Sequence, residues 1–306
     1  MRTEMRREAQ DSVAEHLQSK IANTSRGPIE YVTWGEGPVV LALHGAMGGY
    51  DQGVILARTI GEPGYRYVSV SRPGYLGTPL GSGPTPEQQA DLCAELLDAL
   101  SVADVAVMAV SGGGPCALHF AVRHSHRCRA LILVSTCSQK IDGSVPLAFR
   151  IMKLLAHWPA LVNMMRRKRL SDPEKAARRA IPDPALRERT LQNPESWALF
   201  MELMKSTFDR MPLRLPGTEN DIRVTRAVTT YPLEKIVAPA LIIHGTADRA
   251  VPFTHAKLFE ARIPRAELLA IDGGEHISVF THRNEIRPRV AKLLRESSAR
   301  AAASPV

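Results

Sequence analysis

The sequence predicts an α/β fold, in which helices flank a mostly parallel β-sheet. Short apolar runs, typical of strands buried on both faces, recur along the chain, for example at residues 39–43 and 130–134. Segments with helical periodicity lie between these runs, so strand and helix alternate as they do in doubly wound sheets. Of the 306 residues, 44% are hydrophobic, which is enough apolar material for one large core.

The expected strands end in turns that are rich in glycine and proline. The strand expected at residues 29–34 is followed by Gly35-Glu-Gly-Pro38. The strand at 39–43 is followed by His44-Gly45, and the strand at 67–70 by Ser71-Arg-Pro-Gly-Tyr-Leu-Gly77. No apolar run approaches the ~18–20 residues of a membrane-spanning helix, so no stable membrane insertion is expected. In chain order the expected strands are residues 29–34, 39–43, 67–70, 104–110, 130–134, 240–243 and 267–271.

The clearest helix start is Thr85-Pro-Glu-Gln88. Thr85 can cap the helix, the proline suits the first helical position, and Gln88 completes a capping box. Leu92, Leu96 and Leu100 then line one helical face. Further helices are expected at residues 112–125, around 254–261 and within 277–296.

Both ends of the chain depart from this alternation. Residues 1–24 are polar and charged, but Val13, Leu17 and Ile21 are spaced four apart, which predicts an N-terminal helical extension on the surface. No apolar stretch follows the basic N-terminal residues, so no signal peptide is expected. Residues 297–306 are low in complexity and predict a flexible tail.

A central insertion also interrupts the alternation. Residues 138–228 have helical periodicity and many prolines, and they separate two parts of an α/β core at residues 25–137 and 229–296. We interpret the insertion as a helical cap, or lid. Within it, residues 138–226 carry 17 Lys and Arg against 10 Asp and Glu, which is most of the net charge of +8. The basic run Arg166-Arg-Lys-Arg169, with Arg178 and Arg179, either attracts anionic or membrane-associated substrates or is an ordinary solvated helix face.

Several function classes are excluded by composition and spacing. No zinc-finger or RNA-binding signature accompanies the basic insertion, so no nucleic-acid partner is expected. The four cysteines, Cys93, Cys116, Cys128 and Cys137, form no CxxC pair and predict neither a zinc site nor disulfides. Free thiols and the lack of a signal peptide favour a cytoplasmic location.

The turn after the strand at 104–110 carries the strongest chemical signal. Ser111-Gly-Gly-Gly-Pro115 follows the strand directly and opens a helix, which would lift the serine hydroxyl off the sheet edge. So tight a turn needs small residues two positions before and after the serine, and Ala109 and Gly113 supply them. The pattern is a nucleophile elbow with alanine in place of the first glycine of G-x-S-x-G. The alternative is an ordinary helix N-cap serine.

A serine needs a base to accept its proton, and the base needs a carboxylate to orient it. The candidate base is His276, in the Gly-rich loop after the last expected strand. The candidate acid is Asp248, in the loop after the strand at 240–243, and Asp272 is the competing acid. The chain order Ser111, Asp248, His276 is the order found in hydrolases built on such a sheet. Acid pH would protonate the base and abolish activity.

Acyl transfer also requires amide donors for the developing oxyanion. Gly112, the residue after the candidate nucleophile, offers one N–H. The loop His44-Gly-Ala-Met-Gly-Gly49 offers the other, for which Ala46 is the first choice and Met47 the second. The glycines permit close approach of the backbone to a ligand, although they are equally typical of a simple loop.

Together these segments closely resemble the α/β-hydrolase superfamily. The matching motifs are L-H-G-A-M-G-G, S-R-P-G-Y-L-G-T, A-V-S-G-G-G, H-G-T-A-D-R-A-V-P and G-G-E-H-I, in this order between residues 43 and 277. The resemblance implies the α/β-hydrolase fold, with a mostly parallel eight-stranded sheet and an inserted helical cap over the active site. It also implies no metal and no organic cofactor, with Ser111, Asp248 and His276 as nucleophile, acid and base.

The resemblance narrows the chemistry as well. Haloalkane dehalogenases and soluble epoxide hydrolases of this fold have aspartate at the elbow, where this chain has Ser111. Hydrolases that cleave C–C bonds of meta-fission products usually have asparagine before the serine, where this chain has Val110. The sequence therefore favours a serine hydrolase that cleaves a carboxylic ester or related acyl bond. The alternatives are a lactonase, acyltransferase, perhydrolase or C–C hydrolase with the same triad, and a non-catalytic ligand-binding member of the fold.

The expected partner is a small acyl substrate, anionic or amphipathic in character. Methionine and aromatic residues of the insertion are candidates for an acyl pocket, although ordinary packing explains each equally well. The candidate pocket residues are Trp158, Trp197 and Met201.

Overall fold

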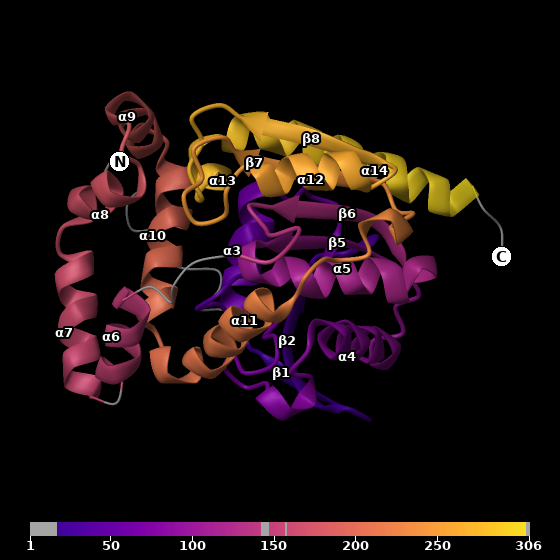
Figure 1. Cartoon of the computed structure of the whole chain (residues 1–306), viewed down its shortest axis with the longest axis horizontal. Coiled ribbons are helices and arrows are strands. Elements are labelled where there is room, and N and C mark those ends of the chain that lie inside the picture. The colour runs from indigo at the N-terminus through magenta and orange to yellow at the C-terminus, as the bar shows by residue number, and fades with distance from the viewer. Residues whose placement is uncertain (1–16, 142–146, 157, 304–306) are drawn as a thin grey trace.

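One eight-stranded sheet organises the molecule (Figure 1). The computed structural model describes residues 17–141, 147–156 and 158–303. The strand order is β1-β2-β4-β3-β5-β6-β7-β8. The strands are β1 (Lys20–Thr24), β2 (Gly27–Trp34), β3 (Val39–Leu43), β4 (Arg66–Val70), β5 (Val105–Val110), β6 (Cys128–Val134), β7 (Ala240–Gly245) and β8 (Ala266–Ile271).

The sheet is mostly parallel, as the sequence predicts. Only the pairs β1–β2 and β2–β4 are antiparallel, and the other five neighbouring pairs are parallel. Strand β3 is buried along its whole length, which explains its uninterrupted apolar sequence. The carboxyl ends of β3, β5, β6, β7 and β8 consequently meet at one edge of the sheet.

Helices cover both faces of the sheet. One core cluster joins the sheet to α4 (Pro86–Ala99), α5 (Gly114–Arg123) and α12 (Thr254–Arg262). A second cluster, on the other face, joins it to α3 (Tyr50–Ile60) and α14 (Arg283–Ala303), with the short α13 (Ser278–Thr281) beside them. The capping box at Thr85 and Gln88 is present at the start of α4, as predicted.

The insertion between β6 and β7 contains six described helices, which we call the cap. Aspartate or asparagine followed by proline starts three of them: Asp172, Asp183 and Asn193 each accept a hydrogen bond from a backbone amide of the helix that follows. The prolines of the insertion therefore mark helix starts. The helices are α6 (Leu147–Leu155), α7 (Pro159–Leu170), α8 (Pro173–Ala180), α9 (Pro184–Gln192), α10 (Pro194–Phe208) and α11 (Leu215–Ala227).

Two expectations for the chain ends need correction. Lys20–Thr24 forms strand β1, so the helix expected over 1–24 is wrong for its last residues, and residues 1–16 lie outside the described chain. The flexible tail expected at 297–306 is wrong as far as Ala303, because α14 extends to that residue. Alanine and arginine are strong helix formers, and they continue the helix through a segment of low complexity.

All four cysteines are buried and free. Burial raises the pKa of Cys128 and of Cys137 to about 12 in each case, so both thiols stay protonated and unreactive at neutral pH.

Within the described residues, no helix has both the length and the apolar composition needed to cross a bilayer.

Candidate active site

Ser111 occupies a strained turn between β5 and α5. Its φ is +50°, a left-handed value that is uncommon for residues other than glycine. A Cβ on Gly113 would lie 2.7 Å from the His44 carbonyl oxygen and 2.8 Å from that of Leu43, both fixed backbone atoms. Ala109 is completely buried. The turn therefore has room only for small residues at these two positions, as the elbow pattern predicts.

The structure brings Ser111, His276 and Asp248 into one hydrogen-bonded chain. His276 Nε2 lies 3.1 Å from Ser111 Oγ, and His276 Nδ1 lies 2.8 Å from Asp248 Oδ2. The three residues follow β5, β7 and β8, whose carboxyl ends lie at the same edge of the sheet. Parallel pairing thus joins side chains up to 165 positions apart in the sequence.

Asp248 is held as a buried carboxylate. Burial by itself raises its pKa, but the hydrogen bond and charge interaction with His276 and the amides of Val251 and Ala250 outweigh this effect, so the pKa is lowered. Its Oδ1 accepts from those amides at 2.8 Å for Ala250 and 2.9 Å for Val251. The competing acid Asp272 lies in an exposed turn, where its Oδ1 accepts from Thr246 Oγ1 at 3.4 Å.

A second histidine, His244, lies behind Asp248. Its Nε2 is 3.5 Å from Asp248 Oδ2 and 2.9 Å from the Val251 carbonyl oxygen. Burial lowers the pKa of His244, so the ring is neutral and donates its Nε2 proton to Val251. His244 therefore supports the loop that carries Asp248. Its place in the H-G-T-A-D segment is the signal that could have identified it from the sequence.

The two candidate oxyanion donors lie next to each other. A Cβ on Gly112 would lie 3.3 Å from the amide nitrogen of Ala46, so the loop after β3 passes directly beside the elbow. The amide of Met47, the second choice from the sequence, donates to Thr218 Oγ1 of α11 at 2.9 Å. This leaves Ala46 and Gly112 as the pair that can face a carbonyl oxygen above Ser111.

Comparisons with known proteins identify the family. The model of the alpha/beta hydrolase fold family matches residues 38–283, which is most of the chain. The chain belongs to the α/β-hydrolase fold family. A solved structure described as an alpha/beta hydrolase fold protein from Nakamurella multipartita is 32% identical, with a TM-score of 0.78, and the match covers 91% of this chain and 99% of that one.

Two curated relatives of this α/β-hydrolase chain are more distant. The uncharacterized hydrolase YcgS of Bacillus subtilis is 27% identical over 262 residues, which are 82% of this chain and 89% of the relative. The pimeloyl-[acyl-carrier protein] methyl ester esterase of Aromatoleum aromaticum is 29% identical over 242 residues, which are 76% of this chain and 88% of the relative.

In this α/β hydrolase, a buried ion pair links the cap to the oxyanion loop. Arg72, in the turn after β4, donates to both carboxylate oxygens of Asp221 on α11, at 2.9 and 2.6 Å. The same guanidinium donates from Nε to the His44 carbonyl at 3.0 Å and from Nη2 to the Gly45 carbonyl at 3.4 Å. These are the two carbonyls that precede the amide of Ala46. Arg72 therefore anchors the loop that carries one oxyanion donor.

Two further groups complete this buried cluster. Tyr75 donates its hydroxyl to Asp221 Oδ2 at 2.6 Å, and burial, then the Asp221 charge, raise the pKa of Tyr75 well above its usual value. His44 Nε2 accepts from the Arg72 amide at 3.0 Å, while Nδ1 lies 2.6 Å from the Gly45 carbonyl. Burial and the nearby Arg72 charge lower the pKa of His44, which fixes a neutral ring with its proton on Nδ1.

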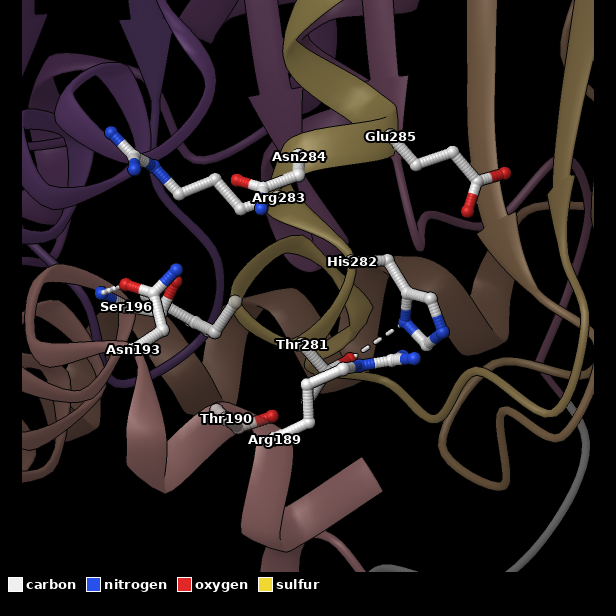
Figure 2. Close-up of a pocket in the computed structure, with 10 residues that line it drawn as sticks. Arg189, Thr190, Asn193, Ser196, Thr281, His282, Arg283, Asn284 and Glu285 are labelled. Atoms are coloured by element: carbon white, nitrogen blue, oxygen red, sulfur yellow. Dashed lines mark hydrogen bonds between the residues drawn. The ribbon is translucent and has the colours of Figure 1, made fainter. Parts of the chain in front are cut away.

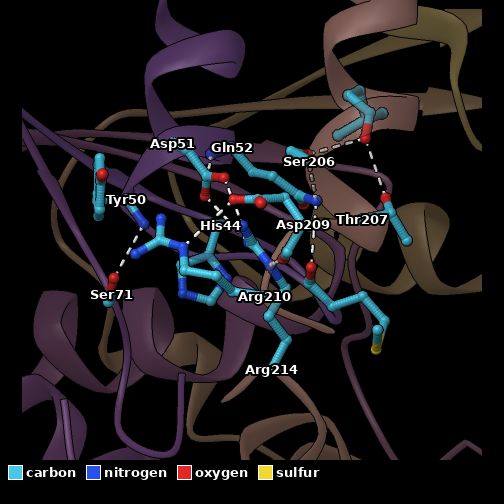
Figure 3. Close-up of polar contacts among 12 residues, drawn as sticks. His44, Tyr50, Asp51, Gln52, Ser71, Ser206, Thr207, Asp209, Arg210 and Arg214 are labelled. Atoms are coloured by element: carbon cyan, nitrogen blue, oxygen red, sulfur yellow. Dashed lines mark hydrogen bonds and ion pairs between the residues drawn. The ribbon is translucent and has the colours of Figure 1, made fainter. Parts of the chain in front are cut away.

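In a second buried ion pair between cap and core, the cap supplies the arginine and the core supplies the aspartate (Figure 3). Arg214, at the start of α11, donates to both oxygens of Asp51 on α3, at 3.0 and 2.6 Å. Beside it, Gln52 Nε2 donates to Ser206 Oγ of α10 at 3.0 Å and to the Met47 carbonyl at 3.2 Å. Both α10 and α11 are thus tied to the loop after β3.

The structure does not bring the three candidate pocket residues together. Trp158, at the N-cap of α7, is 51% exposed. Trp197 and Met201 lie on α10 and pack, partly buried, against the core cluster on the α3 side of the sheet. The cap residues that pack in one cluster with Met47 of the oxyanion loop are others. They include Phe149, Met152 and Phe208.

A cavity of about 280 Å³ opens elsewhere, where α9 and α10 meet α13 and the start of α14 (Figure 2). Most of the residues that line it have polar side chains, and they include Arg189, Asn193, His282 and Arg283. Arg283 is committed to Glu195, with both carboxylate oxygens accepting at 2.7 and 2.6 Å. None of the three residues of the Ser111 hydrogen-bonded chain lines this cavity, so it is separate from the candidate active site.

Proposed function

We propose that the protein is a serine hydrolase that cleaves carboxylic esters through an acyl-enzyme intermediate. The observation that carries this proposal is the hydrogen-bonded chain Ser111–His276–Asp248, with distances of 3.1 and 2.8 Å, beside the adjacent amides of Ala46 and Gly112. A hydroxyl paired with an oriented imidazole, next to two oxyanion donors, is the arrangement that acyl transfer requires.

In the first half-reaction, Ser111 Oγ attacks the carbonyl carbon of the ester while His276 Nε2 accepts its proton. The carbonyl oxygen becomes an oxyanion and accepts hydrogen bonds from Ala46 and Gly112. Collapse of this intermediate breaks the bond to the alcohol oxygen. His276 gives its proton to that oxygen, so a neutral alcohol leaves and the acyl group stays on Ser111.

In the second half-reaction, His276 takes a proton from water, and the resulting hydroxide attacks the acyl carbon. The second oxyanion forms at the same two amides. Its collapse returns the proton to Ser111 and releases the carboxylic acid. Asp248 keeps the imidazole in the tautomer that presents Nε2 to the serine and stabilises the cation that forms in each step.

The name of one of the relatives supports an esterase reaction. The methyl ester esterase from Aromatoleum aromaticum matches over most of both chains. Val110 before the serine, where C–C hydrolases of this fold usually have asparagine, gives no support for C–C cleavage.

The direct test is hydrolysis of short-chain aryl esters by the wild type and by Ser111→Ala. We expect kcat to fall by roughly 10⁴-fold or more in the variant, because loss of the nucleophile removes the covalent route. Ser101→Ala is a matched control, since Ser101 is also a turn serine with positive φ but is exposed and precedes β5, whereas the elbow follows that strand. Undiminished turnover in Ser111→Ala, in a preparation with the wild-type melting temperature, would contradict the proposal.

A further inference from the structure

The outer side of α6 carries an apolar stripe that the fold does not use. Leu147, Ile151 and Leu154 are spaced by four and three residues, which places them on one face of the helix. Trp158 follows after another four residues. The exposed fractions of these four side chains are 67%, 47%, 61% and 51%.

The inner side of the same helix already supplies its packing. Phe149, Met152 and Ala156 lie in a cluster with Met211 and Leu215, near the start of α11. The outer stripe is therefore not needed to hold α6 on the molecule. Of the eight large hydrophobic side chains that are exposed in the described residues, five lie between Leu147 and Met164. Such a concentration is typical of an interaction surface.

The surroundings of the stripe are strongly basic. Residues 143–171 contain no Asp or Glu, and they contain six Lys and Arg. Helices α6 and α7 lie side by side at the end of the molecule opposite the C-terminal end of α14 (Figure 1). Lys153 pairs with Glu219 at 2.6 Å, whereas four other cations of this segment are exposed. These four are Arg150, Arg166, Arg167 and Lys168.

We propose that this face of α6 and α7 binds to the surface of anionic lipid membranes. The aliphatic stripe and Trp158 enter the boundary between headgroups and acyl chains, and the cations contact the anionic headgroups, as in helices that lie in a membrane interface. A nucleic acid would match the charge but not a stripe of leucine and isoleucine. This inference goes beyond the proposed esterase activity and does not rest on it, since soluble esters do not require a membrane.

The first test is co-sedimentation with vesicles of phosphatidylcholine, with and without phosphatidylglycerol. We expect binding to the anionic vesicles, little binding to pure phosphatidylcholine, and weaker binding at high salt. Arg166→Glu/Arg167→Glu should lower the affinity by roughly tenfold or more. Arg295→Glu/Arg300→Glu makes the same change in charge on exposed residues of α14 and should retain most of the affinity.

The second test concerns the apolar stripe. Ile151→Ser/Leu154→Ser should reduce binding to anionic vesicles at low salt, whereas Val237→Ser, at a similarly exposed position beyond the last cap helix, should not. In the wild type, lipids brominated near the headgroup should quench tryptophan fluorescence, and Trp158→Phe should remove most of that quenching. This measurement leaves Ile151 and Leu154 unchanged, so it decides the matter if the double serine variant fails to fold.

Several results would overturn the inference. One is equal binding to neutral and anionic vesicles. Another is a loss of affinity in the α14 control as large as in Arg166→Glu/Arg167→Glu. A third is quenching unaffected by Trp158→Phe. Tight binding to duplex DNA with no binding to anionic vesicles would show that the basic surface serves a different class of partner.

Discussion

The Asp248 carboxylate is fully buried yet stays charged. Its side chain has no exposed surface, and an isolated carboxylate in such a place would be protonated. Two backbone amides and the His276 ring stabilise the charged form instead, and the pKa is lowered. The loop that presents Asp248 is thus built around a negative charge, and this charge orients the imidazole that the proposed mechanism uses.

Replacing this charge tests the role of Asp248 in catalysis. In Asp248→Asn we expect kcat for aryl esters to fall by roughly 10³–10⁴-fold, because the amide can hold the wrong tautomer of His276. Asp272→Asn is the control, because that carboxylate lies in an exposed turn. A similar loss of kcat in both variants would contradict the assignment of the orienting role to Asp248.

The lowered pKa of Asp248 also predicts how stability depends on pH. A group whose pKa is lower in the folded state stabilises the fold above its unfolded pKa of about 4, and this contribution is lost as the pH falls through the folded value. The difference in melting temperature between the wild type and Asp248→Asn should therefore shrink as the pH is lowered below about 4. A difference that stays constant or grows under acid conditions would be inconsistent with a stabilised carboxylate.

Helix α11 is the element that connects the cap to the chemistry. Asp221 on this helix pairs with Arg72, which holds the two carbonyls before Ala46. Thr218 on the same helix accepts a hydrogen bond from the Met47 amide. A displacement of α11 would therefore move the oxyanion loop. Asp221 is a positioning residue in this arrangement.

We expect Asp221→Asn to destabilise the protein by about 3 kcal/mol, since the substitution leaves the buried Arg72 charge without its partner. Because the oxyanion amides act mainly in the transition state, kcat should fall more than KM changes. Asp209→Asn, which alters an exposed cap carboxylate, should change neither measurably. A stable Asp221→Asn variant with normal kcat would remove α11 from this role.

At the level of elements, sequence patterning succeeded where signals are local. The elbow, the loops after β7 and β8 and the α4 capping box are each defined within a few residues. Strand β1 was missed because it is a short edge strand in which only Ile21 and Ala22 are apolar, and Ile21 is 51% exposed. Helix α3 was missed because it contains Gly53, a residue that disfavours helices. A Cβ there would lie 2.1 Å from Ser69 Oγ, so close packing on the sheet requires the glycine.

For the molecule as a whole, the cap divides into a tethered part and a peripheral part. Two buried Arg–Asp pairs join core and cap. In one, Arg72 of the core binds Asp221 of the cap, and in the other, Arg214 of the cap binds Asp51 of the core. Both pairs involve the segment from Arg214 to Asp221. Helix α7, by contrast, is mostly exposed. Among its described side chains, Val162 is buried, and most of the others are exposed. Sequence patterning located the insertion but could not pair Arg72 with Asp221, which are 149 residues apart.

This division should appear in hydrogen exchange. Amides of α11 should exchange several-fold more slowly than those of α7, because opening α11 breaks two buried ion pairs. Helix α5, buried beneath the elbow, is an internal reference for full protection. Exchange of α7 as slow as that of α11 would mean that the cap moves as a single unit.

The role of Ser111 as the nucleophile is tested most directly by the site of covalent labelling with a fluorophosphonate. That site is determined by mass spectrometry of the intact protein and its peptides. We expect one adduct per chain, on Ser111, with no adduct in Ser111→Ala and much slower labelling in His276→Ala. A full adduct on another residue, or equal labelling of Ser111→Ala, would contradict this role.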